Sequence, residues 1–226
     1  MSQQHSTESL HPWFSFYDKG VPHTVSVPET GLAEVLDRTA AEYGRREAVV
    51  FQNRHITYVE LQVLAEQMAA ALRRRGVGEG DRVSIMLPNL PQTFIAFWGV
   101  IKAGAIAVMT NPLYMESELT HQIHDAGVKH LITLDIFWPK IARLWDRLEL
   151  DVCYVTRIRD GLSFPLNWLQ PFSARRQKTW VSVPFNGKSI VAWPDLFKSG
   201  ERLNVKVENP RERIALLQYT GGTTGV

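Results

Sequence analysis

Two amphipathic helices are predicted in the first part of the chain. Apolar residues recur at helical spacing over about 31–43, after Thr30 as a candidate N-cap. A second apolar stripe follows Thr57, which has the sequence of a capping box with Glu60, and it continues to Gly76. Between these helices, two β-rich runs on either side of a polar turn predict a short hairpin.

After Asp81 the pattern changes to short apolar runs that alternate with helical stretches. The runs are RVSIML, AIAVM, HLITLD and DVCYV, and helices are predicted near 91–103, 116–126 and 137–148. Strands that are apolar throughout are typical of parallel sheets with both faces covered. The sequence therefore predicts an α/β fold with a mostly parallel sheet and flanking helices.

The end of the chain divides into two further regions. Regular periodicity is lost over 157–193, where prolines separate aromatic and basic residues, so this segment is predicted to be an irregular insertion. From Arg213, RIALLQ predicts one more buried strand, which leads directly into YTGGTTGV. The predicted organisation is thus a sheet region at 28–156, an insertion at 157–193, and a strand with a glycine-rich loop at 213–226.

Composition and charge exclude several classes of protein. The 226 residues are 45% hydrophobic and 21% charged, as in ordinary globular proteins, and a net charge of +2 argues against a nucleic-acid binder. The single cysteine, Cys153, excludes an intramolecular disulfide and is expected to be buried. The apolar stretch 94–109 contains Lys102 and is too short for a membrane span, so it predicts a buried helix followed by a buried strand. No secretory signal is visible, and a cytoplasmic location is expected.

The most informative chemistry lies in the last residues of the sequence. A strand followed by Gly221, Gly222, Thr223, Thr224 and Gly225 presents consecutive backbone N–H groups and two hydroxyls, which can wrap a polyphosphate. The spacing matches neither a Walker A loop nor the dinucleotide-binding fingerprint. Taken alone, the same residues are equally compatible with an ordinary glycine turn.

Two longer passages change that balance. The segments ITYVELQVLAEQMAAALRRRGVGEGDRVSIMLPN and FWGVIKAGAIAVMTNPLY, together with the loop, resemble the N-terminal half of the adenylate-forming acyl-CoA synthetases, specifically the long-chain fatty acid–CoA ligases. That family has a TY-led helix, a GDRV strand, an LPN turn, KAGA and NPLY segments and a YTGGTTG phosphate loop in this order. The resemblance extends over about 28–226.

The resemblance implies that 1–226 is the N-terminal portion of a large adenylate-forming domain, without the C-terminal domain. It implies that a phosphate-binding motif for ATP is formed by Thr220, Gly221, Gly222, Thr223, Thr224 and Gly225. No catalytic or metal-ligating residue is transferred. The full-length enzyme is expected to use ATP, Mg²⁺ and coenzyme A to convert a long-chain fatty acid to acyl-adenylate and then acyl-CoA. The chain looks like a fragment and is expected to be inactive alone.

Residues 162–180 combine apolar, aromatic and basic side chains, which is the chemistry of a membrane interface. We expect peripheral contact with lipid on the inner face of the membrane. The alternative is a loop folded over the domain with its aromatic side chains buried, and Pro165 and Pro171 are expected to prevent one continuous amphipathic helix. A ligase of an aryl or amino acid, a non-catalytic binding or membrane-contact module, and a homodimer all stay open.

Overall fold

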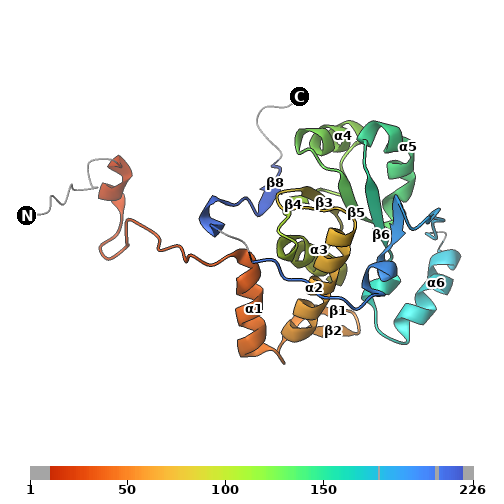
Figure 1. Cartoon of the computed structure of the whole chain (residues 1–226), viewed down its shortest axis with the longest axis horizontal. Helices are drawn as coiled ribbons and strands as arrows, with labels where there is room; N and C mark the ends of the chain where they lie inside the picture. Colours follow the sequence, from red (N-terminus) through yellow and green to blue (C-terminus); the bar gives the residue numbers. More distant parts are fainter. Residues whose placement is uncertain (1–10, 178, 207–208, 221–226) are drawn as a thin grey trace, which may run out of the picture.

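The computed structural model of the chain describes residues 11–177, 179–206 and 209–220 (Figure 1). Its centre is a sheet with the strand order β7-β6-β5-β3-β4-β8, in which every neighbouring pair is parallel. The strands are β3 (Arg82–Met86), β4 (Ile106–Met109), β5 (His130–Leu134), β6 (Val152–Thr156), β7 (Ile190–Ala192) and β8 (Leu216–Gln218). The α/β prediction is confirmed, and the four predicted apolar runs are the four central neighbours.

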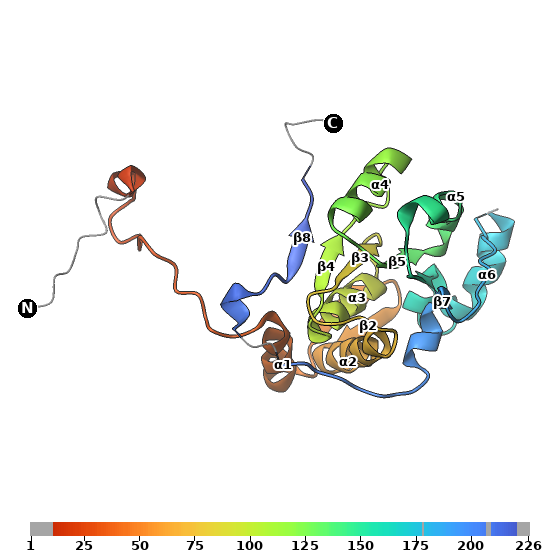
Figure 2. The ribbon, with the colours of Figure 1, turned by 45° about the horizontal axis from the view of Figure 1, so that its top comes forward.

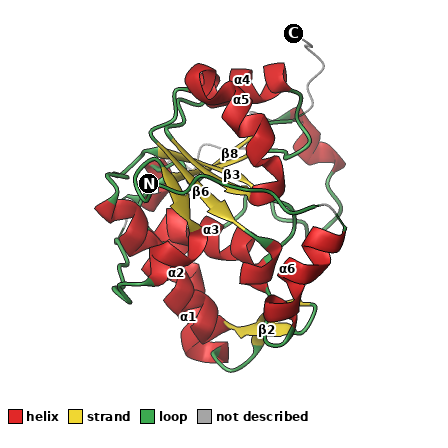
Figure 3. Cartoon of the chain, turned by 90° about the vertical axis from the view of Figure 1, so that its right-hand side faces the viewer, coloured by secondary structure: helices red, strands yellow, loops and turns green. Residues whose placement is uncertain are grey.

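Helices cover both faces of this sheet, which therefore lies between two layers (Figure 3). The helices α1 (Leu32–Tyr43), α2 (Tyr58–Arg74) and α3 (Pro91–Lys102) share one hydrophobic core with the sheet. The helices α4 (Glu116–Asp125) and α5 (Trp138–Leu148) share a second core on the opposite face, where Cys153 is buried as expected. The hairpin is confirmed as β1 (Glu47–Phe51) and β2 (Arg54–Thr57).

Short 3₁₀ turns connect several of these elements. They are η2 (Pro12–Phe16), η3 (Asp135–Phe137), η4 (Ile158–Gly161), η5 (Trp193–Phe197) and η6 (Pro210–Glu212). The turn η2 lies in an extended N-terminal arm that projects from the body of the molecule (Figure 1).

The helix starts confirm one prediction and correct another. The capping box of α2 is present, because the Glu60 N–H donates to the Thr57 hydroxyl (3.3 Å) and the Thr57 N–H donates to the Glu60 carboxylate (2.7 Å). The predicted cap at Thr30 is wrong. The N-cap of α1 is Gly31, and the Thr30 hydroxyl instead accepts a hydrogen bond from Arg38 (3.4 Å).

The apolar stretch 94–109 forms most of α3 and then β4, as predicted. Within it, Gly99 permits close contact between α3 and α2. A Cβ at this position would lie 2.5 Å from Met68 Cγ, a distance that side chains do not tolerate. Within the described ranges, we find no helix with both the length and the hydropathy to cross a bilayer.

The predicted irregular insertion at 157–193 contains more regular structure than expected. It includes η4, helix α6 (Leu166–Arg176), and β7, which extends the sheet beside β6. Pro171 lies inside α6 and leaves the carbonyl of Asn167 without its helical donor. Asn167 is exposed, so water can satisfy that carbonyl, and a proline is tolerated there.

The prediction for RIALLQ is correct in type and wrong in burial. Leu216 to Gln218 pair in parallel with β4, but Leu216 and Gln218 are both exposed. These side chains are exposed because β8 is the outermost strand of the described sheet and has a neighbouring strand, β4, on one side only.

His130 begins β5 and is buried, with its Nδ1 3.1 Å from the Tyr154 hydroxyl. Burial lowers the pKa of His130 below its usual value, although the carboxylates of Asp81 and Asp151 act in the opposite direction. Because the folded chain then binds fewer protons than the unfolded chain, protonation favours unfolding.

The free energy of unfolding is therefore expected to fall as the pH decreases below about 6.5, the ordinary pKa of histidine. His130→Gln should show a smaller decrease than the unaltered chain in urea titrations at a series of pH values across that range. His121→Gln changes an exposed histidine and should leave the decrease unchanged. An identical pH dependence in His130→Gln and the unaltered chain would contradict this assignment.

Candidate functional site

The carboxyl ends of the parallel strands meet at one edge of the sheet, which is where open α/β sheets bind ligands. The strand β8 reaches this edge beside β4, with Gln218 in register with Met109. Thr220 follows and is exposed. It is the one predicted phosphate-binding residue that the structure describes. Outside the described residues lie Gly221, Gly222, Thr223, Thr224 and Gly225.

Tyr219 fixes the end of β8 where the predicted loop begins. Its hydroxyl donates to the carboxylate of Asp125, the last residue of α4, and its ring packs against the core on that face. Burial, together with the hydrogen bond to the Asp125 carboxylate, raises the pKa of Tyr219 to about 12. Tyr219 therefore keeps its proton at neutral pH and can donate this bond continuously. In the sequence, Tyr219 is distinguished only by its place in the YTGGTTG motif.

The NPLY turn after β4 is held in place by its own backbone and by α5. The Leu113 N–H donates to the Asn111 side chain (3.0 Å), which closes the turn locally. The Lys140 ammonium group donates to the carbonyls of Pro112 (3.3 Å) and Tyr114 (2.7 Å). Since β4 neighbours β8, this fixed turn forms part of the same sheet edge as Thr220.

A second polar cluster lies at the carboxyl ends of β5 and β6. Asp135 Oδ2 lies 3.4 Å from the Nε of Arg157, and the Asp160 carboxylate accepts hydrogen bonds from the Arg157 N–H (2.8 Å) and the Thr156 hydroxyl (3.1 Å). Burial raises the pKa of both Asp135 and Asp160 above their usual values. No signal in the sequence had singled out these carboxylates.

The same cluster connects the sheet to the segment that returns from α6. The Arg157 guanidinium lies over the rings of Trp180 (4.6 Å) and Phe185 (5.6 Å), and the Arg175 guanidinium also lies over the Trp180 ring, at 4.9 Å. Each charged side chain of the cluster therefore lies against another group of the protein, although the buried Arg157 Nε makes no hydrogen bond with a described residue. We interpret this arrangement as structural support for the 157–193 segment.

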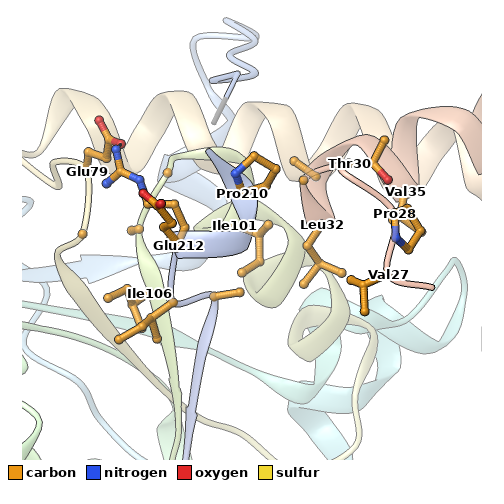
Figure 4. A pocket seen from close by; sticks show the side chains of 18 of the residues that line it. Val27, Pro28, Thr30, Leu32, Val35, Glu79, Ile101, Ile106, Pro210 and Glu212 are labelled. Carbon is orange, nitrogen blue, oxygen red and sulfur yellow. Dashed lines mark ion pairs between the residues drawn. The ribbon is translucent and has the colours of Figure 1, made fainter. Parts of the chain in front are cut away.

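An apolar pocket of about 570 Å³ lies near the opposite, amino end of the strands (Figure 4). Its walls come from α1, the preceding residues 27–30, the start of β4 at Ile106, and the segment 210–215. An ion pair between Arg213 and Glu79 lies at its border. Because this pocket is at the amino end of β4, it is distinct from the edge that carries Thr220.

The histidines near α4 have separate partners. His124 Nε2 lies 2.7 Å from the carbonyl oxygen of Arg147, whereas His130 contacts Tyr154. Across the part of the chain that the structure describes, no group of three His, Cys, Asp or Glu side chains is arranged to hold a metal ion.

Comparison with curated proteins confirms the resemblance of the sequence to long-chain fatty acid–CoA ligases. The long-chain-fatty-acid--CoA ligase of Bacillus subtilis is 38% identical over 221 residues, which are 96% of this chain and 39% of that protein. The enzyme of the same name from Escherichia coli O157:H7 is 31% identical, over 95% of this chain and 38% of its own length. The chain thus spans about two fifths of the curated relatives it matches.

Solved structures with the same fold include two CoA ligases. An anthranilate CoA ligase in complex with anthranoyl-AMP aligns with a TM-score of 0.70 at 23% identity, over 88% of this chain and 34% of that protein. A long-chain-fatty-acid-CoA ligase from Archaeoglobus fulgidus aligns with a TM-score of 0.68 at 22% identity, over 92% and 38% of the two chains. Residues 36–226 match the family described as AMP-binding enzyme, and the chain belongs to that family.

Proposed function

We propose that the protein containing this chain activates a long-chain fatty acid with ATP, forming acyl-adenylate and pyrophosphate, and then transfers the acyl group to coenzyme A. The observation that carries this proposal is the family match over 36–226, which includes the YTGGTTG motif that follows β8. The position of Thr220 at the carboxyl edge of the sheet supports it, because ligands of open α/β sheets bind there.

The chemistry requires charge stabilisation more than covalent catalysis by side chains. A fatty acid carboxylate is a weak nucleophile that must attack the α-phosphorus of an anionic triphosphate. Backbone N–H groups and hydroxyls of the proposed loop would hold the β- and γ-phosphates and stabilise the charge that passes to pyrophosphate. Thr220, Thr223 and Thr224 would contribute the hydroxyls, and none of them acts as nucleophile or base. A bound Mg²⁺ would supply further charge neutralisation of the triphosphate.

The identity of the acid is the finer part of the proposal. The curated relatives with 38% and 31% identity are both named for long-chain fatty acids. The 4-coumarate--CoA ligase 1 of Petroselinum crispum, which is named for an aryl acid, is 24% identical over 75% of this chain. The higher identity and wider coverage favour the fatty acid.

Acid-dependent exchange of pyrophosphate into ATP tests both parts. In the protein encoded by the complete reading frame that contains these residues, a long-chain fatty acid is expected to support exchange, and 4-coumarate is not. Exchange with 4-coumarate alone would contradict the proposed substrate, and absence of exchange with either acid would contradict adenylate formation. Hydroxamate trapping of the activated acyl group provides an independent readout.

The 226-residue chain assayed by itself is expected to give no exchange. It spans about 39% of the length of the Bacillus subtilis relative, and displacement of reacting groups by about 1 Å can cost ~100-fold in rate. Appreciable exchange by this chain, above that of its Thr223→Ala, Thr224→Ala double variant, would contradict this expectation and would show that residues 1–226 suffice for adenylation.

A further inference from the structure

Helix α6 presents an aromatic stripe to solvent. Trp168 and Phe172 are four residues apart on one side of the helix, and Phe164 lies in the segment just before it; the three side chains are 64%, 60% and 78% exposed. The rings of Trp168 and Phe172 contact each other edge to face, with centroids 5.7 Å apart. The alternative in which these aromatic side chains are buried is therefore wrong for this structure. Single exposed apolar residues are common on protein surfaces, but three exposed aromatic side chains within nine residues of one segment, two of them in contact, indicate an interaction site.

Positive charge accompanies the stripe. Arg175 and Arg176 occupy the last turn of α6 and are exposed, and the Arg175 guanidinium also lies over the Trp180 ring, at 4.9 Å. Between 161 and 194 the sequence has four basic residues and no Asp or Glu. We call the exposed surface formed by Phe164, Trp168, Phe172, Arg175 and Arg176 the α6 face. Its charge is uncompensated by any acidic residue of the same segment, so it is complementary to a negatively charged surface.

The α6 face is held by the body of the protein. The Asn53 side-chain amide, in the turn of the β1–β2 hairpin, donates to the carbonyls of Ser163 (3.3 Å) and Phe164 (3.2 Å). The Ser163 N–H donates back to the Asn53 side chain (3.3 Å). The backbone before α6 is therefore fixed while the Phe164 ring points outward. Preorganised aromatic groups lose less conformational freedom when they enter an interface than groups on a loose loop do.

The location of the α6 face separates it from the proposed ATP site. It lies beside β7, the outermost strand on one side of the sheet, whereas β8 and Thr220 lie at the outermost strand on the other side (Figure 2). Five strand spacings of about 4.8 Å place the two edges roughly 24 Å apart. A large surface can therefore lie against α6 while the carboxyl edge beside β8 stays accessible to nucleotide.

We propose that the α6 face docks on the surface of a membrane that contains anionic lipid. The aromatic rings would lie at the level of the headgroups, and Arg175 and Arg176 would pair with lipid phosphates and carboxylates. This occupant accounts for both halves of the surface, because aromatic rings favour the boundary between headgroups and acyl chains and arginines add attraction to negative lipid. Docking of this kind would hold the protein at the phase in which long-chain fatty acids dissolve.

Co-sedimentation with vesicles tests the proposal. The 226-residue chain is expected to bind vesicles of phosphatidylcholine with phosphatidylserine more strongly than vesicles of phosphatidylcholine alone, and added salt should weaken the binding. Arg175→Gln with Arg176→Gln should lower the partition coefficient roughly 30-fold at low salt, about fivefold for each arginine. Trp168→Ala with Phe172→Ala should reduce binding to both kinds of vesicle, since it removes the apolar contact.

Matched controls separate this surface from general charge and hydrophobicity. Arg73→Gln with Arg147→Gln removes two exposed arginines elsewhere, and Trp13→Ala with Phe16→Ala removes two exposed aromatic residues of the N-terminal arm. Both control variants should bind vesicles as the unaltered chain does, and far-UV circular dichroism checks that each variant is folded. The proposal is overturned if the unaltered chain does not bind vesicles, or if folded α6-face variants bind as well as it does. Self-association that the α6-face substitutions abolish, without vesicle binding, would identify a second copy as the occupant and would also overturn it.

Discussion

Replacing Lys102 by methionine is expected to lower the free energy of unfolding by about 3 kcal/mol or more, the usual effect of removing one partner of a buried ion pair. Lys102 is the last residue of α3 and its side chain is fully buried. Its ammonium group contacts the carboxylate of Asp37 on α1 and lies 3.6 Å from that of Glu66 on α2. One cation thus joins three helices of the same layer.

The carboxylates that pair with Lys102 have further polar partners. Asp37 also accepts hydrogen bonds from Gln62 (2.7 Å) and Asn204 (2.6 Å), and Glu66 accepts from Arg202 Nε (2.7 Å). Partial burial opposes ionisation of Asp37, but the hydrogen bonds, first that of Lys102, hold its pKa below its usual value. Without the positive charge of Lys102, the negative charges of Asp37 and Glu66 remain in a partly buried site with fewer partners to stabilise them.

Urea unfolding of the 226-residue chain provides the measurement. Lys129→Met is the matched control, because Lys129 is half exposed and lies 3.6 Å from the exposed Glu149, so its loss should cost less than about 1 kcal/mol. Adding Asp37→Asn to Lys102→Met should recover part of the lost stability, since the uncompensated charge is then removed. Equal destabilisation by the Lys102 and Lys129 variants would show that this network contributes no more than a surface pair.

The fold was predictable where the apolar pattern is long and regular. The helices α2 and α3 and the central strands follow from stripes and runs that only one backbone geometry can bury. The segment 157–193 was mispredicted for local reasons. Strand β7 has three residues, too few to show a period, and Pro171 is a helix breaker in most contexts that an exposed helix accommodates.

The long-range contacts of Lys102 and Tyr219 were not predictable from a single sequence. Lysines are almost never fully buried unless they are paired, and the carboxylates that pair with Lys102 are 65 and 36 positions away in the chain. The bond from Tyr219 to Asp125 joins residues 94 positions apart. The family resemblance predicted the order of the KAGA and YTGGTTG segments. The structure adds a physical role for the first residue of each: Lys102 forms a buried ion pair, and Tyr219 bonds to Asp125.

The chain is bonded to the rest of the fold both before and after β8. The segment that precedes β8 is bonded to the Lys102 layer, since the Leu203 N–H donates to the carbonyl of Glu66 (3.0 Å) and the Val205 N–H donates to that of Lys102 (3.0 Å). Beyond β8, Tyr219 is bonded to α4. The strand β8 therefore lies between two bonded segments, and Tyr219 and Thr220 follow it directly at the carboxyl ends of the strands.

Thr223→Ala together with Thr224→Ala is expected to lower the rate of fatty-acid-dependent pyrophosphate exchange by about 10²- to 10³-fold in the protein from the complete reading frame. The two hydroxyls are proposed to donate to the phosphates that leave as pyrophosphate, where negative charge grows during attack on the α-phosphorus. Donors that interact more strongly with the transition state than with bound ATP affect kcat more than KM. The loss should therefore appear mainly in kcat.

The comparison needs a variant that loses a hydroxyl without touching the loop. Thr179→Ala serves this purpose, because Thr179 is exposed and its hydroxyl donates to the Ala174 carbonyl at the end of α6, far from β8. Its exchange rate should equal that of the unaltered protein. A loop double variant with an unchanged exchange rate would remove these hydroxyls from the mechanism. A rise in the KM for ATP with kcat preserved would instead assign them to binding of ATP in the ground state, and the stabilisation of the leaving group would then rest on the backbone N–H groups.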